Sequence, residues 1–363
     1  MRSTKKRASS ATSSLQLQFP TPKKRVVLSD LTNSPDNVGS TRNSEDFAPN
    51  KPKCENNGAY RNCELDEPTK SETVISSTCM DHFNCTYSNS IHSHLRAQEM
   101  EVHRRPFPDY METVQNEVST FMREILVNWL VEVAEEYKLV SDTIYLTISY
   151  IDRFLSSNVV SKSKIQLLGV SCMLNASQYE EISPPNVEDF CYITDNSYTK
   201  EEVMDMEREV QKFLNFEMGV PTIKNFLRQE CCKIIYTRAA QENCNSSNLQ
   251  FELLGCYLAE LSLLDYTCVR FLPSVIAASA IFLTRFTIQP EMHPWSLALQ
   301  CYSGYRPFDL MECVLTLHDS QINRKGSSLQ AVREKYMQHK YKCVASLTSP
   351  SEIPVCYFEV ING

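Results

Sequence analysis

The stretch FMREILVNWLVEVAEEY, residues 121–137, decides the fold of this 363-residue chain. Its side chains Met122, Ile125, Trp129 and Val133 recur three or four residues apart, which is the spacing of one face of an α-helix. The opposite side is apolar as well, and a helix that is apolar nearly all round is typical of the centre of a helical domain. We therefore predict a buried central helix over residues 121–137.

More helices are predicted on the C-terminal side of this stretch, because helix-starting residues precede each apolar segment. The starts are a cap at Ser141-Asp142 for a helix to Leu155, a cap at Ser161 for residues 162–178, Pro184-Pro185 for a short helix toward Tyr192, and a capping box of Thr199 and Glu202 for a helix to Phe216. Five helices in about 100 residues predict one compact all-α domain.

A similar pattern returns after Pro221. Helices are predicted over residues 222–236, 251–266, 270–286, 293–302 and 308–321, and a last one over 328–341 after a break at Gly326. The small-residue stretches LGVSC (168–172) and IAASA (276–280) let helix backbones approach closely, and they lie at matching places in the two halves. We predict an all-α fold with two five-helix units in tandem.

Charge and composition divide the chain into four parts. Residues 1–95 are rich in Ser, Thr, Asn and Pro without a sustained period, so we predict a disordered tail. The two helical units span 96–220 and 221–345, and a second tail spans 346–363. Residues 96–363 hold 24 Lys and Arg against 34 Asp and Glu, a net charge of −10, which disfavours nucleic-acid binding.

Composition also bounds the class of protein. Eight glycines are few for a turn-rich β-sandwich or a glycine-rich phosphate-binding fold. Fifteen cysteines without a Cys-x-x-Cys pair are typical of reduced thiols. Neither an apolar run of roughly 18 residues nor a secretory signal occurs. We expect a soluble protein inside the cell that does not bind a membrane.

Catalytic motifs are missing from the sequence. It has no Walker loop, no G-x-G-x-x-G, no H-E-x-x-H and no G-x-S-x-G. The pair Cys231-Cys232 has no nearby histidine to act as a base, and the cluster of Cys79, His82, Cys85, His92 and His94 fits no zinc spacing. We predict no catalytic residue, no metal site and no cofactor, and hence no enzyme.

Four stretches in order along the chain closely resemble the cyclin box of A-type cyclins: MREILVNWLVEV (122–133), YIDRFL (150–155), ASQYEEI (176–182) and FCYITD (190–195). The stretch LQAVREKY (329–336) is similar to the plant A-type group, and the resemblance extends from Tyr110 to the C-terminus. It implies two tandem cyclin boxes in a regulatory subunit. Such a subunit binds and activates a cyclin-dependent serine/threonine kinase as a heterodimer and controls progression through S, G2 and M phases.

The resemblance also implies which residues face the kinase. They are Gln178, Tyr179, Glu180, Glu181, Glu207, Phe216 and Met218. Without the resemblance, Phe216 and Met218 would be interpreted as ordinary core residues and Glu207 as part of a solvated helix face. Gln178 stands where the family usually has lysine, and Asn128 where it has aspartate. Because a hydrogen bond to a charged group contributes about 1.5–3 kcal/mol, we expect the chain to bind its kinase more weakly or with a different selectivity.

A substrate groove is a second implication of the resemblance. The matching positions are Met122, Ile125, Leu126, Trp129, Glu132, Ile165 and Gln166. Such a groove would take the leucine of an Arg-x-Leu substrate or inhibitor on its apolar surface and the arginine near Glu132. The alternative is that these apolar side chains are simply core.

Arg123 and Asp152 correspond to a family pair, and both lie in apolar helices. Either charge would be costly to bury alone, so we predict that they form an ion pair joining the first two helices of the first box.

Short motifs in the tail imply regulation. Arg25, Leu28 and Asn33 fit a destruction box read by a ubiquitin ligase of the anaphase-promoting type. Lys5, Lys6, Arg7, Lys23 and Lys24 form basic clusters that suit nuclear import, and Thr21-Pro22 fits a site for proline-directed phosphorylation beside one of them. We expect a nuclear protein with part of its pool in the cytoplasm. The alternatives are a cyclin-fold transcription factor that binds DNA, which the net charge disfavours, and a cyclin with weakened kinase activation.

Overall fold

The computed structural model describes residues 90–228, 245–323 and 329–359. Several predictions therefore lie outside the described residues. In the tail these are the predictions at Lys5, Lys6, Arg7, Thr21, Lys23, Lys24, Arg25, Leu28 and Asn33. The others concern Cys79, His82, Cys85, Cys231, Cys232, Gly326, the starting residue Ser328 and the helix over 229–236.

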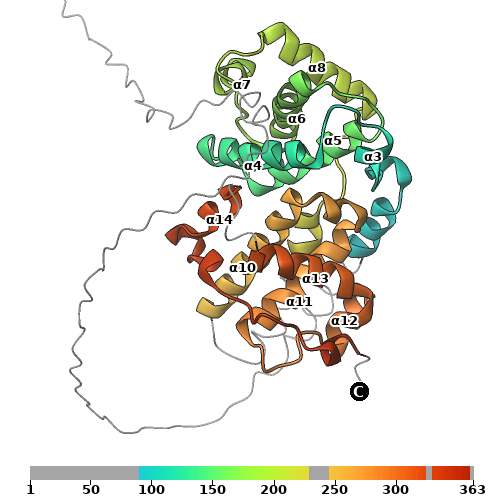
Figure 1. Cartoon of the computed structure of the whole chain (residues 1–363), viewed down its shortest axis with the longest axis vertical. Coiled ribbons are helices and arrows are strands. Elements are labelled where there is room, and N and C mark those ends of the chain that lie inside the picture. Colours follow the sequence, from blue (N-terminus) through green and yellow to red (C-terminus); the bar gives the residue numbers. More distant parts are fainter. Residues whose placement is uncertain (1–89, 229–244, 324–328, 360–363) are drawn as a thin grey trace, which may run out of the picture.

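The described residues form two helical units in tandem without a β-strand, which confirms the predicted fold class. The first unit contains α3 (Tyr110–Thr113), α4 (Thr120–Glu136), α5 (Ser141–Leu155), α6 (Ile165–Glu180), α7 (Val187–Ile193) and α8 (Lys200–Phe213). The second contains a helical segment from 223 to 228 and then α10 (Asn245–Leu264), α11 (Pro273–Ile288), α12 (Leu297–Ser303) and α13 (Pro307–Asn323). Figure 1 shows one unit above the other, with α14 (Ala331–Tyr336) returning to lie against α4 of the first.

The centre of the first unit is α4, as the sequence predicts. Leu126, Val127 and Leu130 have no exposed surface, and the helix begins where Ser119 Oγ accepts a hydrogen bond from the Met122 N–H. On α6, Gly169 lets the two helices pack closely, because a Cβ atom there would lie 2.8 Å from a methyl carbon of Leu126.

Several helix ends differ from the prediction. The Thr199–Glu202 capping box at the start of α8 is confirmed. By contrast, α5 has no cap from its own first residues, α6 starts at Ile165 after a 3-10 turn, and α7 is capped by Asn186 together with Asp189. In the second unit α11 is shifted: it begins at Pro273, after a 3-10 turn over 266–270, and ends two residues beyond the prediction at Ile288. α12 and α14 are shorter than predicted, because the Ser296 cap starts α12 at Leu297 and a separate 3-10 turn over 339–341 follows α14.

The predicted boundary of the tail is wrong by a few residues. Residues 90–99 form a helix, although the prediction assigns residues up to 95 to a disordered tail. This helix packs on the second unit: the His92 ring contacts Phe226 and Tyr302, and Arg96 hydrogen-bonds Ser274. The local sequence did not predict this helix, because most of its residues are polar and the residues it packs on lie far away in the sequence.

Within the described ranges, no helix is long and apolar enough to cross a membrane. The same residues contain no group of three His, Cys, Asp or Glu side chains arranged to hold a metal ion. The described cysteines are all free thiols, and most of them are buried.

Candidate protein-docking surface

Large hydrophobic side chains are exposed where α6 ends beside the turn that follows α8. Tyr179 is 54% exposed, Phe216 is 67% exposed, and Ile182 is fully exposed. We call these three residues the docking surface. Gln178 and Glu180 beside them are exposed, whereas Glu207 and Met218 are half-buried. The structure thus brings the predicted kinase-facing residues to one end of the first unit.

The backbone after α8 turns Phe216 outward. Asn215 and Phe216 both have a left-handed conformation, with φ of 51° and 60°, which is uncommon for residues with a side chain. The turn is held by hydrogen bonds from the Phe216 N–H to the Gln211 carbonyl and from the Glu217 N–H to the Leu214 carbonyl. Because a helix cannot continue through such residues, α8 ends at Phe213 rather than at Phe216 as predicted.

The turn after α8 also contacts the end of α6. A Cβ atom on Gly219 would lie 2.6 Å from the Tyr179 hydroxyl, so a larger residue there would displace the end of the Tyr179 side chain. The Tyr150 hydroxyl donates to the Met218 carbonyl at 2.8 Å, and Arg104 donates to the Gly219 carbonyl at 3.1 Å. The docking surface is therefore fixed by hydrogen bonds from α5 and from the segment before α3.

The carboxylates around this surface have different tasks. Glu181 accepts hydrogen bonds from the Val140 N–H at 2.8 Å and the Thr143 hydroxyl at 2.7 Å, so it supplies the missing cap of α5. Glu207 accepts from the Gln211 amide at 3.1 Å. The pKa of Glu180 is raised, chiefly by partial burial and then by the charge of Asp142.

The Gln178 side chain takes no part in this hydrogen-bond network. Its side chain is exposed and makes no hydrogen bond to another residue that the structure describes. The amide is therefore free to meet a partner from solution.

Most residues of the predicted substrate groove are buried in this structure. Glu132 is exposed and accepts a hydrogen bond from the Asn128 amide at 3.2 Å. The other six residues are at most 7% exposed and belong to the core or its edge: Met122, Ile125, Leu126, Trp129, Ile165 and Gln166. Their burial is what the core interpretation expects, so docking of a substrate at this place stays a prediction.

Arg123 and Asp152 are paired as the sequence predicts. The Nε and Nη2 atoms of Arg123 donate to the two Asp152 oxygens, each at 2.7 Å, and the Tyr110 hydroxyl adds a third bond at 2.8 Å. Burial alone would lower the pKa of Arg123, but the charges of Asp152 and Tyr110 outweigh it and the pKa is raised. The guanidinium is therefore firmly charged and fully paired.

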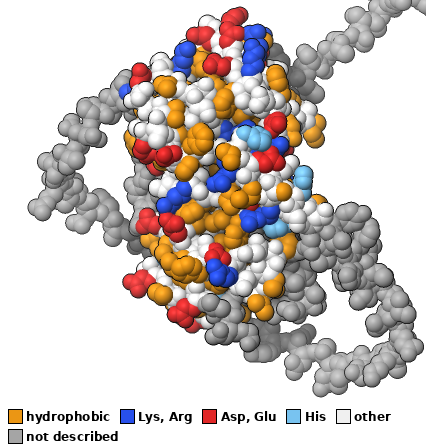
Figure 2. All heavy atoms as spheres, turned by 90° about the vertical axis from the view of Figure 1, so that its right-hand side faces the viewer, with side chains coloured by type: hydrophobic (Ala, Val, Ile, Leu, Met, Phe, Trp, Pro, Cys, Tyr) orange, Lys and Arg blue, Asp and Glu red, His pale blue; other side chains and the backbone are white. Residues whose placement is uncertain are grey.

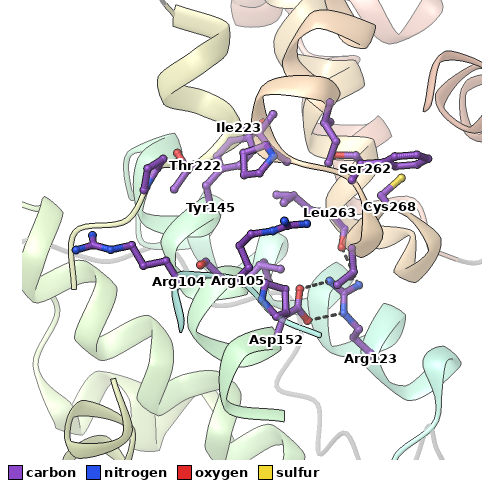
Figure 3. A pocket seen from close by; sticks show the side chains of 18 residues that line it. Arg104, Arg105, Arg123, Tyr145, Asp152, Thr222, Ile223, Ser262, Leu263 and Cys268 are labelled. Carbon is purple, nitrogen blue, oxygen red and sulfur yellow. Dashed lines mark hydrogen bonds and ion pairs between the residues drawn. The ribbon is translucent and has the colours of Figure 1, made fainter. Parts of the chain in front are cut away.

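The pair has a second function that the sequence did not indicate. Arg123 Nη1 donates to the Leu263 carbonyl at 3.0 Å, at the C-terminal end of α10 in the second unit. Figure 3 shows this contact at the base of a small cavity of about 100 Å³ between the units, into which the Arg105 side chain points. A cation at a helix C-terminus is favourable, so Arg123 joins the two units as well as α4 and α5.

Two docking features escaped the sequence prediction. Ile182 is the last residue of ASQYEEI (176–182), one of the stretches that resemble the cyclin box. Its position directly after Glu180 and Glu181, two residues predicted to face the kinase, could have identified it. Arg104 was hidden in the basic run His103-Arg104-Arg105, because nothing in that run indicates contact with a carbonyl more than a hundred residues away.

Comparison with known protein families gives two matches that together cover most of the chain. The model described as "Cyclin, N-terminal domain" matches residues 90–219, and "Cyclin, C-terminal domain" matches residues 221–350. The first match begins where the described structure begins, and the two meet at the linker before the second unit.

Individual relatives agree with this result. Over 276 residues the chain is 57% identical to Cyclin-A3-1 of Oryza sativa subsp. japonica, covering 76% of this chain and 72% of the relative. It is 48% identical to Cyclin-A3-4 of Arabidopsis thaliana over 364 residues, covering 99% and 96%. Among solved structures, a viral cyclin from herpesvirus saimiri has a TM-score of 0.54 at 21% identity, covering 63% of this chain and 96% of that one, and shares the fold.

Proposed function

This chain belongs to the cyclin family, with plant A-type cyclins among its relatives, and we propose that it binds and activates a cyclin-dependent serine/threonine kinase. Cyclins are regulatory subunits rather than enzymes, so the site to explain is a docking site. The observation that carries the proposal is the exposure of Tyr179, Ile182 and Phe216 on a hydrogen-bonded framework.

Exposed aromatic and aliphatic side chains of this size favour a protein partner. Interfaces derive most of their binding energy from a few such residues once they are desolvated. On the face seen in Figure 2, hydrophobic and basic side chains lie together across the middle, and acidic ones lie mainly around the margin. A partner helix with apolar residues along one side fits such a surface.

Activation follows if the chain binds one conformation of the kinase more tightly than the other. A ligand shifts a conformational equilibrium only by its difference in affinity for the two states. A rigid surface maximises that difference, and the left-handed turn at Phe216 and the Glu181 cap on α5 keep this one rigid. The chain then acts on catalysis by positioning the kinase's own residues.

The proposal is tested by removing the exposed side chains. Phe216→Ala with Ile182→Ala should weaken kinase binding by at least about 30-fold, equivalent to about 2 kcal/mol, and should reduce histone phosphorylation in parallel. Leu315→Ala, which removes an exposed apolar side chain from α13 in the second unit, is the matched control. Equal affinities of the double variant and the control for every kinase tried would refute the proposal.

Recruitment of Arg-x-Leu substrates or inhibitors is a finer part of the proposal. It is supported by the exposed Glu132 carboxylate beside the thin strip of Trp129 that remains exposed on α4. Glu132→Gln should weaken a fluorescent Arg-x-Leu peptide several-fold without changing kinase affinity. A peptide that binds both forms equally would contradict docking at this place.

Regulation through the tail is the remaining part of the proposal. Arg25→Ala with Leu28→Ala should lengthen the protein's lifetime in dividing cells, if an anaphase-promoting ligase reads this motif. Neutralising Lys5, Lys6 and Arg7 together with Lys23 and Lys24 should reduce nuclear accumulation. Following the level and location of the tagged chain through S, G2 and M phases checks both, and unchanged behaviour would remove the corresponding motif from the proposal.

A further inference from the structure

Arg153 on α5 is an unusual buried arginine. Its residue is only 4% exposed, and its Nη2 atom donates to the His103 carbonyl at 3.2 Å. Its Nε and Nη1 atoms are buried and make no hydrogen bond within the part of the chain that the structure describes. Buried guanidinium groups normally face a carboxylate, because an unpaired buried charge is costly. Arg123, one helix away, shows the ordinary arrangement.

A cavity of about 470 Å³ lies beside Arg153. We call it the Arg153 pocket, and its wall includes Phe107, Arg153, Ser157, Phe213, Leu214 and Asn215. None of these lining residues is acidic. The pocket therefore combines partly apolar walls with a cationic group that has no hydrogen-bonded carboxylate among the described residues.

The carboxylates of Glu101 and Glu217 beside this pocket are already engaged by His103 and Arg104. Glu101 accepts from Arg104 Nε at 2.7 Å, and Glu217 lies 3.4 Å from Arg104 Nη2 and 3.2 Å from the His103 ring. Burial lowers the pKa of Arg153, and the charge of Arg104 lowers it further, whereas Tyr150 and Glu217 act in the opposite direction. A negative charge placed beside Arg153 would therefore stabilise its buried positive charge.

We propose that the Arg153 pocket receives a carboxylate side chain of the kinase partner. The inference rests on the proposed function, because the pocket adjoins the docking surface: Asn215 in its wall directly precedes Phe216. In the proposed complex a partner that covers Phe216 also covers the adjoining pocket. Inside the closed pocket the apolar walls exclude water and strengthen a charge-assisted hydrogen bond.

A carboxylate fits the charge of the pocket better than a phosphate does. Arg153 offers one uncompensated positive charge, which one carboxylate neutralises, whereas a phosphate monoester carries almost two negative charges. Arg105 also lines the pocket, but Figure 3 shows its side chain directed into the neighbouring cavity between the units. Arg105, the second cation that could bind a phosphate, therefore directs its side chain away from the Arg153 pocket.

The first test leaves Arg153 untouched and supplies a carboxylate from the chain itself. Ser157 is exposed and lines the pocket, so Ser157→Glu can reach Arg153, and Ser157→Gln is its neutral match. We expect Ser157→Glu to raise the melting temperature above that of Ser157→Gln and to weaken kinase binding about tenfold relative to it. Equal melting temperatures and equal affinities of the two variants would overturn the proposal.

The second test identifies the partner group. Arg153→Gln should weaken kinase binding at least tenfold, whereas Arg208→Gln on the exposed face of α8 should not. Exposed Asp and Glu residues of the kinase are then replaced one at a time by Asn and Gln. The carboxylate that enters the pocket is the one whose replacement weakens wild-type binding but not binding of the Arg153→Gln chain. If no kinase residue behaves in this way, the assignment is wrong.

Two results separate this inference from the proposed function. If the wild-type chain binds no kinase, the proposed function fails, yet the Ser157→Glu melting temperature still tests whether Arg153 accepts a carboxylate. If the kinase is bound and inorganic phosphate stabilises the wild-type chain but not Arg153→Gln, the pocket is a phosphate site and the carboxylate assignment is overturned. If Arg153→Gln does not fold, the Ser157 pair alone decides.

Discussion

The exposed side chain of Gln178 marks the clearest departure from the family pattern at the scale of one residue. It stands at the C-terminal end of α6, where a lysine is usual, and no described residue occupies its amide. Gln178→Lys should tighten kinase binding about tenfold, because a hydrogen bond from a charged donor is stronger than one from a neutral donor. Isothermal calorimetry measures the change, with Gln178→Met as the uncharged control. Equal dissociation constants for the lysine and methionine variants would contradict it.

Arg123 is a single side chain whose loss should lower stability strongly. Arg123→Ala leaves Asp152 buried without its bidentate partner and also removes the bond to Leu263, so we expect a loss of about 3–5 kcal/mol in the free energy of unfolding. Arg270→Ala is the control, because that arginine pairs with Glu312 at the surface and exposed pairs contribute at most about 1 kcal/mol. Urea unfolding of both variants checks the contrast, and similar midpoints would show that the buried pair is dispensable.

At the scale of elements, the sequence predicts what depends on neighbours along the chain. The spacing in residues 121–137 predicts α4 because one face of a helix is a local property, and the Thr199–Glu202 box works across three residues. The start of α5 is different, because its cap is Glu181, far along the chain. The exposure of Phe216 followed only from the family resemblance, since its left-handed backbone has no glycine to announce it.

The start of α11 offers a test of such a distant cap. Pro273 has no N–H, and the next donor, the Ser274 N–H, is bonded to Glu99 at 3.1 Å, with the Ser274 hydroxyl donating to the same carboxylate at 2.6 Å. A negative charge is also favourable at a helix N-terminus. Glu99→Gln should therefore destabilise the chain by about 1–2 kcal/mol.

Hydrogen exchange locates this effect. Amides at the start of α11 should exchange faster in Glu99→Gln, whereas those of α6 should be unchanged. Glu209→Gln, on the exposed face of α8, controls for the loss of one surface charge. If α11 exchanges at the wild-type rate in both variants, Glu99 is not its cap.

At the scale of the whole molecule, the two units are joined at several separate points. Arg123 bonds α10, Arg228 at the start of the second unit pairs with Asp142 at 2.8 Å, and the helix at 90–99 lies on α11 and α12. On α14 itself, the buried Lys335 pairs with Glu260 of α10 at 2.9 Å. Such interlocking favours one cooperative folding unit, although the family models divide the chain into two domains.

Asn128 is the residue that tests this cooperativity. Its side-chain oxygen accepts the N–H of Ala331, the first residue of α14, at 2.9 Å, and both groups are buried. Asn128→Ala leaves that N–H without a partner, at a cost of about 1–3 kcal/mol, and should release α14 from α4. We expect the wild-type chain to unfold in one calorimetric transition and the alanine variant to show a broadened or split one. Asn128→Asp keeps the acceptor and should retain one transition, so an alanine variant that unfolds in one wild-type-like step would show that the contacts of Arg123, Arg228 and Glu99 hold the units together without α14.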